Sequence, residues 1–146
     1  MSSAPEARSR TVGPDRWGEL LGLELLEASA SRVTARVQAG PRHHQPYGIL
    51  HGGVYCSIVE GVASTGAGRV ALARGDAGVV GVSNQTDFFR SHGAGELQIL
   101  GEPLHVGRHQ QVWQVTIRRA SDQALVARGQ VRFHTLDQLP GERRRE

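Results

Sequence analysis

The residues between Gln45 and Ser64 have the types and the spacing that chemistry at a carbonyl group would use. Gln45 and His51 stand before the pair Gly52-Gly53, which would form the first turn of a helix. The free N–H groups of a helix N-terminus, aided by the helix dipole, can stabilise a carbonyl oxygen that gains negative charge. Glycine at this turn lets a substrate approach the backbone closely, because glycine has no Cβ.

Glu60 stands about two helical turns beyond these glycines, and Ser64 follows it on the same helix face. A carboxylate with a neighbouring hydroxyl can act as a nucleophile or as a general base that holds a water molecule. Because Ile58, Val59 and Val62 surround Glu60 in the sequence, we expect a buried carboxylate, and buried carboxylates are candidates for function. Taken singly, each residue also has an ordinary explanation, as a helix cap, a tight turn or a surface acid.

A long helix over residues 51–72 must position these side chains. Its apolar residues recur every four positions, at Val54, Ile58 and Val62, which is typical of an α-helix. The same segment contains Gly61, Gly66 and Gly68. Since each internal glycine costs about 1 kcal/mol relative to alanine, we expect a sheet that wraps closely around this helix.

Alternating apolar and polar residues predict strands on both sides of the long helix. The predicted strands cover residues 22–29, 33–39, 79–90, 95–107, 110–120 and 124–136. A short helix would follow Pro14, and residues 41–50 would form a loop in which His43 and His44 are exposed. This order of elements predicts an α+β domain with one helix on one antiparallel sheet.

The length of 146 residues suits a single domain, which we place at residues 13–138 between tails at 1–12 and 139–146. All 17 basic residues are Arg, and they are scattered through the predicted strands, which argues against nucleic-acid binding. The single cysteine, Cys56, excludes an internal disulfide and is expected to be a small core residue. No secretory signal, membrane-length apolar span or zinc-ligand spacing is recognisable, so we expect a cytoplasmic protein without a metal or cofactor.

The segment 45–53, Gln-Pro-Tyr-Gly-Ile-Leu-His-Gly-Gly, with Glu60 and Ser64 after it, resembles the active-site segment of PaaI-type hotdog thioesterases. It is most similar to the Arthrobacter-type 4-hydroxybenzoyl-CoA thioesterases and to their menaquinone-pathway relatives that act on 1,4-dihydroxy-2-naphthoyl-CoA. The similarity runs from about residue 16 to about residue 136. It includes the segments 81–91, 103–108 and 111–114.

The resemblance implies a hotdog fold, in which an antiparallel sheet of about five to six strands wraps a long central helix. It also implies roles for the residues at the start of that helix. The N–H of Gly52, beside Gly53, would polarise the thioester carbonyl. Gln45 and His51 would position the thioester and assist the departing thiol.

The resemblance assigns the hydrolytic step to the second pair of residues. Glu60 would attack the carbonyl or activate water, and Ser64 would orient it. It further implies a homodimer or homotetramer that binds an acyl-CoA at the dimer interface. Glu60 and Ser64 would then come from the partner subunit.

A further group of residues would lie near the CoA phosphates, the pantetheine arm or the acyl group. These residues are Phe88, Arg90, Ser91, His105, Val106, Gly107 and Arg108. Phe88 stands where menaquinone-type members commonly have a histidine, which indicates a more apolar edge of the site. Together with Phe89 and Tyr47, it favours a flat aromatic acyl group over a short or medium aliphatic one. Adjacent strand residues face opposite sides, so we expect only one of the two phenylalanines to line the site.

Two other functions use the same kind of site. A hotdog hydratase or dehydratase would act on acyl-CoA or on acyl carrier protein, but it would use a catalytic Asp and His pair. Here the helix acid is Glu60 and the loop supplies Gln45, which favours hydrolysis. A non-catalytic acyl-CoA-binding module is the second alternative, and the complete set of Gln, His, Gly-Gly and Glu argues against it.

Overall fold

The glycine-rich segment after His51 forms α2 (Gly52–Arg74), the helix on which the rest of the fold packs. His51 is its N-cap, because its Nδ1 accepts a hydrogen bond from the N–H of Gly53 at 2.8 Å. Gly75 ends the helix in the left-handed conformation, at a φ of 78°. The side chains of Ile58 and Val59 are fully buried, so this part of the apolar stripe faces the core.

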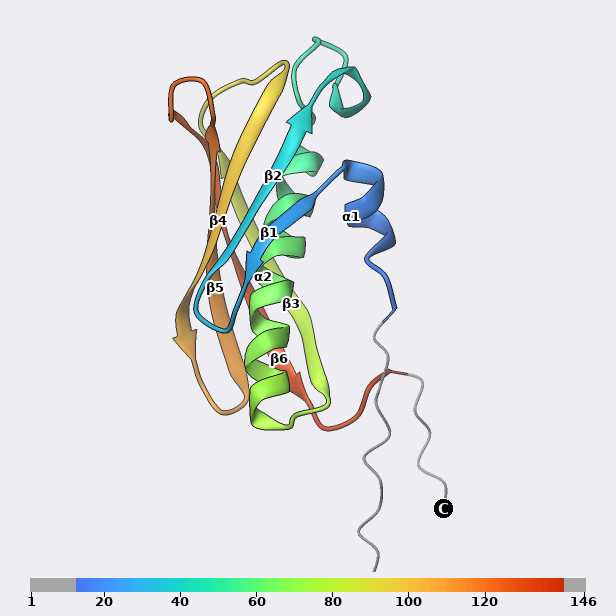
Figure 1. Ribbon diagram of the computed structural model, residues 1–146, viewed down its shortest axis with the longest axis vertical. Coiled ribbons are helices and arrows are strands. Elements are labelled where there is room, and N and C mark those ends of the chain that lie inside the picture. Colours follow the sequence, from blue (N-terminus) through green and yellow to red (C-terminus); the bar gives the residue numbers. More distant parts are fainter. Residues whose placement is uncertain (1–12, 141–146) are drawn as a thin grey trace, which may run out of the picture.

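The computed structural model describes residues 13–140, where a six-stranded antiparallel sheet packs against α2 (Figure 1). The strands are β1 (Glu24–Ala28), β2 (Val33–Ala39), β3 (Gly78–Phe88), β4 (Gly95–Val106), β5 (Gln110–Arg119) and β6 (Leu125–Leu136). Their order across the sheet is β1-β2-β4-β5-β6-β3. The prediction of a hotdog fold, with a long helix wrapped by an antiparallel sheet, is confirmed.

Two short elements complete the described chain. The first is α1 (Arg16–Leu21), whose N-cap Asp15 accepts a hydrogen bond from the N–H of Gly18 at 3.0 Å. The second is a 3₁₀ turn (Pro41–His43) in the loop before α2. The predicted N-terminal tail lies outside the described residues, and the domain boundaries stay a prediction. No helix within residues 13–140 is long and apolar enough to cross a membrane.

The sheet approaches α2 closely at one of the glycines in the helix. A Cβ built on Gly66 would lie 2.3 Å from the ring of Trp113 on β5, which is itself fully buried. Gly68 is different, because a Cβ built there would meet nothing within 4 Å. The predicted close packing of sheet on helix is therefore real, and it requires glycine at position 66.

β3 is an edge strand with an unusual surface. It pairs with β6 on one side, and no strand among the described residues covers its other side. Val80 and Val82 on this strand are 42% and 53% exposed. A long, open and partly apolar edge invites pairing with another strand.

Candidate active site

A first cleft, of about 310 Å³, opens at the N-terminal end of α2. Five of the predicted site residues line it together, namely Gln45, Gly52, Phe88, Arg90 and Ser91. Its remaining walls are Ile49, Leu50, Tyr55 and Phe89. The loop before the helix and the end of β3 therefore line one cleft together.

Gly52 lines this cleft, and its N–H is a free hydrogen-bond donor. It has no acceptor among residues 13–140, whereas the N–H of Gly53 is taken by His51. A Cβ on Gly52 would lie 2.5 Å from Cε2 of Phe88, so a side chain at this position would have to displace the half-exposed Phe88 ring. A free N–H at the positive end of a helix dipole can stabilise a carbonyl oxygen that becomes negative.

The loop holds the side-chain amide of Gln45 in one orientation. The N–H of Tyr47 donates a hydrogen bond to Oε1 of Gln45, and a backbone N–H can only donate. The Nε2 group is therefore the end of the amide left to donate to a substrate. The turn is closed by the N–H of Gly48, which donates to the carbonyl of Gln45 at 3.0 Å, with Gly48 at a φ of 77°.

Histidines fix this loop to the fold, and one of them contradicts the sequence-based expectation. His43 was expected to be exposed but is only 3% exposed. Its Nδ1 accepts from the N–H of Gly40 at 3.2 Å, and its Nε2 lies 2.9 Å from the carbonyl of Leu21. Both ring nitrogens are thus satisfied by backbone groups, which allows burial. His44, which is half-buried, bonds the carbonyl of Gly93 at 2.6 Å.

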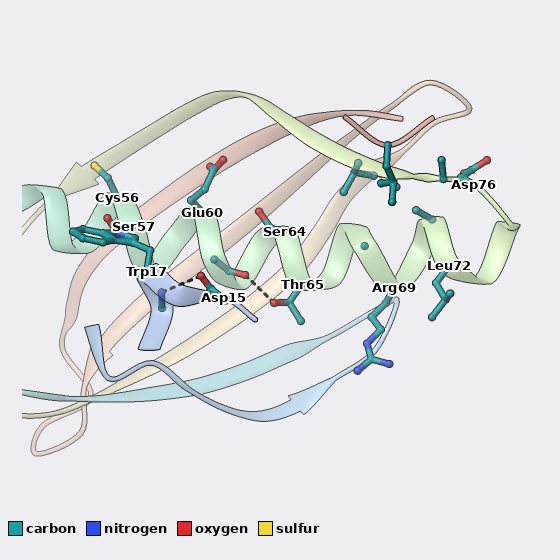
Figure 2. Close-up of a pocket in the computed structure, with 18 residues that line it drawn as sticks. Asp15, Trp17, Cys56, Ser57, Glu60, Ser64, Thr65, Arg69, Leu72 and Asp76 are labelled. Carbon is teal, nitrogen blue, oxygen red and sulfur yellow. Dashed lines mark hydrogen bonds between the residues drawn. The ribbon is translucent and has the colours of Figure 1, made fainter. Parts of the chain in front are cut away.

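Glu60 and Ser64 line a second cleft, of about 900 Å³, between α1, α2 and the start of β3. Figure 2 shows both side chains projecting from the same side of the helix, with Cys56 one turn before them. Cys56 is half-buried and lines this cleft, so the expectation of a core cysteine was wrong. Glu60 is likewise half-buried, because the sheet covers the opposite face of α2.

An amide on β3 orients the carboxylate. Nδ2 of Asn84 donates to Oε2 of Glu60 at 3.2 Å and to the carbonyl of Cys56 at 3.0 Å. The hydroxyl of Thr86 donates to Oδ1 of Asn84 at 2.7 Å, which keeps the NH₂ end turned to the carboxylate. Gly81 leaves room for Glu60, since a Cβ there would lie 2.3 Å from Oε1. Sequence reasoning missed Asn84, because its partner is 24 residues away.

The two clefts are separate within one chain. Gly52 and Glu60 are eight residues apart on α2, which corresponds to about 12 Å along the helix axis. That distance is too long for the Gly52 N–H and the Glu60 carboxylate to act on one thioester carbonyl. One chain therefore carries both halves of the predicted site without joining them.

The aromatic residues differ in part from expectation. Both Phe88 and Phe89 line the first cleft and are about half exposed, so the expectation that only one lines the site was wrong. The reason is that β3 ends at Phe88, and the alternation of strand residues ends with it. Tyr47 is 89% exposed and does not line this cleft.

The predicted CoA-binding turn, with His105, Val106, Gly107 and Arg108, lies at the other end of the molecule. The carbonyl of Gly107 accepts a hydrogen bond from Nη1 of Arg74, the last residue of α2, at 2.7 Å. Gly52 begins the same helix, about 33 Å away along its axis. The structure does not bring this turn to the first cleft of the same chain, and its role stays a prediction. No group of three His, Cys, Asp or Glu within residues 13–140 could hold a metal ion.

Comparison with known proteins identifies the family. A model of the thioesterase superfamily matches residues 47–126. The chain is 44% identical over 121 residues to the Mycobacterium tuberculosis protein Rv1847, whose name describes an esterase, covering 82% of this chain and 86% of that protein. It is 29% identical over 107 residues to the 1,4-dihydroxy-2-naphthoyl-CoA hydrolase of Listeria monocytogenes, covering 73% and 85% of the two chains.

Solved structures agree with the sequence matches. The structure of Rv1847 has a TM-score of 0.80 at 41% identity, covering 85% of this chain and 98% of that chain. The crystal structure of AziG from S. sahachiroi has a TM-score of 0.79 at 44% identity, covering 86% and 98%. The prediction of a PaaI-like thioesterase is confirmed. The chain therefore belongs to the thioesterase superfamily and is a thioester hydrolase of hotdog fold.

Proposed function

We propose that this chain hydrolyses aromatic acyl-CoA thioesters at a site that two copies of the chain build together. The proposal rests on the observation that the two halves of the predicted site lie in separate clefts of one chain. Gly52 supplies a free N–H in one cleft, and Glu60 supplies a carboxylate in another, about 12 Å along α2. A second copy of the chain can place its carboxylate where the first chain has none.

A two-fold axis would join the halves. If two α2 helices lie antiparallel with Cys56 at the level of the axis, each Gly52 lies opposite Glu60 of the partner subunit, because 56 is midway between 52 and 60. The open edge of β3, with Val80 and Val82 exposed, supports pairing on this side of the molecule. Glu60 and Cys56 are both held by Asn84 of β3, so the helix face and the strand edge would be covered together.

The chemistry follows from the donors and acceptors in the two clefts. The thioester oxygen would accept hydrogen bonds from the Gly52 N–H and from Nε2 of Gln45. Glu60 of the partner subunit would attack the carbonyl carbon or remove a proton from the water that attacks it, with Ser64 beside it.

Collapse of the resulting intermediate breaks the C–S bond, and the CoA thiolate takes up a proton. Where Glu60 itself has attacked, water then cleaves the mixed anhydride, which releases the acid and restores the carboxylate. In neutral His51 the ring proton lies on Nε2, because Nδ1 accepts from the N–H of Gly53. His51 is exposed and directly precedes Gly52 in the chain, and it would supply this proton.

The walls of the first cleft support an aromatic acyl group. Phe88, Phe89 and Tyr55 contribute three rings to a space of about 310 Å³, which suits a flat ring better than a long alkyl chain. The naphthoyl-CoA hydrolase of Listeria monocytogenes, to which the chain is similar, is named for an aromatic substrate.

A thiol-release assay with benzoyl-CoA, hexanoyl-CoA and palmitoyl-CoA tests the proposal, with the Glu60→Gln variant as the inactive control. We expect the highest kcat/KM for benzoyl-CoA. A clear preference for palmitoyl-CoA would contradict the aromatic acyl group but not hydrolysis. Absence of thiol release from all three would contradict the proposed acyl-CoA substrate. Water addition to an enoyl-CoA without thiol release would indicate a hydratase.

A further inference from the structure

Tyr55 has a buried hydroxyl that no group in the described part of the chain satisfies. It lies three residues after Gly52 on α2, is 3% exposed, and lines the first cleft. Its ring packs on Phe88, with 5.5 Å between the ring centroids and 39° between the planes. The hydroxyl oxygen has no hydrogen-bond partner among residues 13–140. A buried tyrosine hydroxyl normally has a hydrogen-bond partner. We therefore look for the partner of the Tyr55 hydroxyl in a molecule bound in the cleft.

The hydroxyl is a donor under all ordinary conditions. Burial raises the pKa of Tyr55 to about 12, and the nearby Arg119 guanidinium opposes this effect to a smaller extent. The phenol therefore stays protonated at neutral pH and can offer its O–H to an acceptor oxygen.

The other walls of this cleft offer the acyl group little hydrogen bonding. Phe88, Ile49 and Leu50 are apolar. Nη1 of Arg90 already donates to the carbonyl of Leu125 at 2.8 Å. Gln45 and Gly52 face the thioester in the proposed function. Arg90 keeps further N–H groups and Ser91 has a hydroxyl, but both of these residues are exposed. Tyr55 is thus the buried donor of the cleft that can distinguish a polar substituent on the acyl ring from a hydrogen atom.

We propose that Tyr55 determines specificity, by donating a hydrogen bond from its hydroxyl to an acceptor oxygen carried on the ring of an aromatic acyl group bound in the first cleft. This inference rests on the proposed function. It assigns the choice between substituted and unsubstituted rings to one atom, because replacing Tyr55 with Phe removes that atom and keeps the ring that packs on Phe88.

The test compares kcat/KM for benzoyl-CoA, 3-hydroxybenzoyl-CoA and 4-hydroxybenzoyl-CoA in the wild type, Tyr55→Phe and Tyr47→Phe. The chain has two tyrosines, and Tyr47→Phe removes the same atom from an exposed side chain. The wild type should prefer one hydroxybenzoyl isomer over benzoyl-CoA. Tyr55→Phe should reduce that preference about tenfold, as expected for loss of one hydrogen bond, because kcat/KM falls more for the hydroxybenzoyl isomer than for benzoyl-CoA. Tyr47→Phe should keep the preference.

A Tyr55→Phe variant with the wild-type preference would overturn the inference, and so would a wild type that prefers benzoyl-CoA to both isomers. Thiol release by the wild type is scored separately, so its absence with all three aromatic substrates signals failure of the proposed function itself. Thermal unfolding without ligand gives a second readout. Tyr55→Phe should match or exceed the Tm of the wild type, since the hydroxyl has no partner. A Tm lowered by several degrees would assign the hydroxyl a structural role and contradict the proposal.

Discussion

Glu60 combines access to a cleft with a fixed orientation. Asn84 holds one carboxylate oxygen, and Gly81 leaves room for the other. The half-buried carboxylate of Glu60 is accessible to a substrate in the second cleft, and its orientation is fixed by the hydrogen bond from Asn84 on β3. The amide of Asn84 can also bond a glutamine at position 60, so replacing the carboxylate by an amide should leave the fold intact.

The Glu60→Gln variant should therefore lose catalysis rather than stability. General acid–base catalysis contributes about 10²–10⁴ in rate, and we expect kcat to fall by about a hundredfold or more. Steady-state kinetics on the best acyl-CoA substrate, together with the Tm of the variant, provides the check. Turnover close to that of the wild type in a folded variant would remove Glu60 from the mechanism.

Tyr55 also makes a prediction about stability at high pH. Its pKa is about 12 in the folded chain against 10.0 for an ordinary tyrosine. Between these values the unfolded chain loses the proton first, so the free energy of unfolding falls as pH rises, by up to about 1.4 kcal/mol per pH unit. The stability that depends on protonated Tyr55 is fully present below the pKa of tyrosine in the unfolded chain. It is lost as pH rises through the pKa of Tyr55 in the folded chain.

Urea unfolding at about pH 9 and about pH 11 measures this loss. The wild type should lose more stability between the two conditions than Tyr55→Phe does. Equal losses in both proteins would show that Tyr55 does not titrate in the way that its burial requires.

At the residue scale, the sequence predicts what is local. Gly52, His51 and the cap between His51 and Gly53 are neighbours in the chain, and their motif identifies them. Asn84 and His43 are different, because their partners lie 24 and 22 residues away. Which distant groups meet depends on how the elements pack, and a single sequence does not give that.

At the element scale, the glycines of α2 divide into two kinds. Gly66 is covered by Trp113, which a Cβ would approach to 2.3 Å, whereas Gly68 has nothing within 4 Å of the same position. Sequence composition treats these residues as equivalent. The packing of β5 on the helix separates a glycine that the fold requires from one that it does not.

The Gly66→Ala variant should destabilise the protein by about 1–3 kcal/mol, because a methyl group forced against a buried ring must displace it. Gly68→Ala is the matched control, on the same helix and two residues away. It should leave the stability unchanged or raise it by up to about 1 kcal/mol, as alanine favours the helix. Urea unfolding measures the change in the free energy of unfolding for both variants. Equal changes in Gly66→Ala and Gly68→Ala would contradict the close packing at Trp113.

Periodicity predicts the elements well but not their arrangement. The strands and the long helix lie within a few residues of the predicted ranges. The position of β3 beside β6 was not predictable, because it requires a crossover past three strands. The burial of Glu60 was wrongly expected for a related reason. Apolar neighbours show that a helix has a core face, but they do not show which of its other faces the sheet leaves open.

At the scale of the whole molecule, the proposed function makes one chain an incomplete catalyst. The free N–H at the start of α2 and the carboxylate of Glu60 open into different clefts. The strand beside the carboxylate, β3, presents an unpaired edge. Both features are explained together if a second copy covers this side of the molecule and supplies the missing half of each site.

Subunit complementation tests this central claim most directly. Glu60→Ala and Gln45→Ala chains are each expected to be inactive alone, since every site lacks one essential group. After subunit exchange of an equal mixture, half of the dimers contain both chains, and each of these holds one intact site. The account predicts recovery of about one quarter of the wild-type activity. No recovery, with exchange demonstrated by differently tagged chains, would place both halves of the site in a single chain and contradict the account.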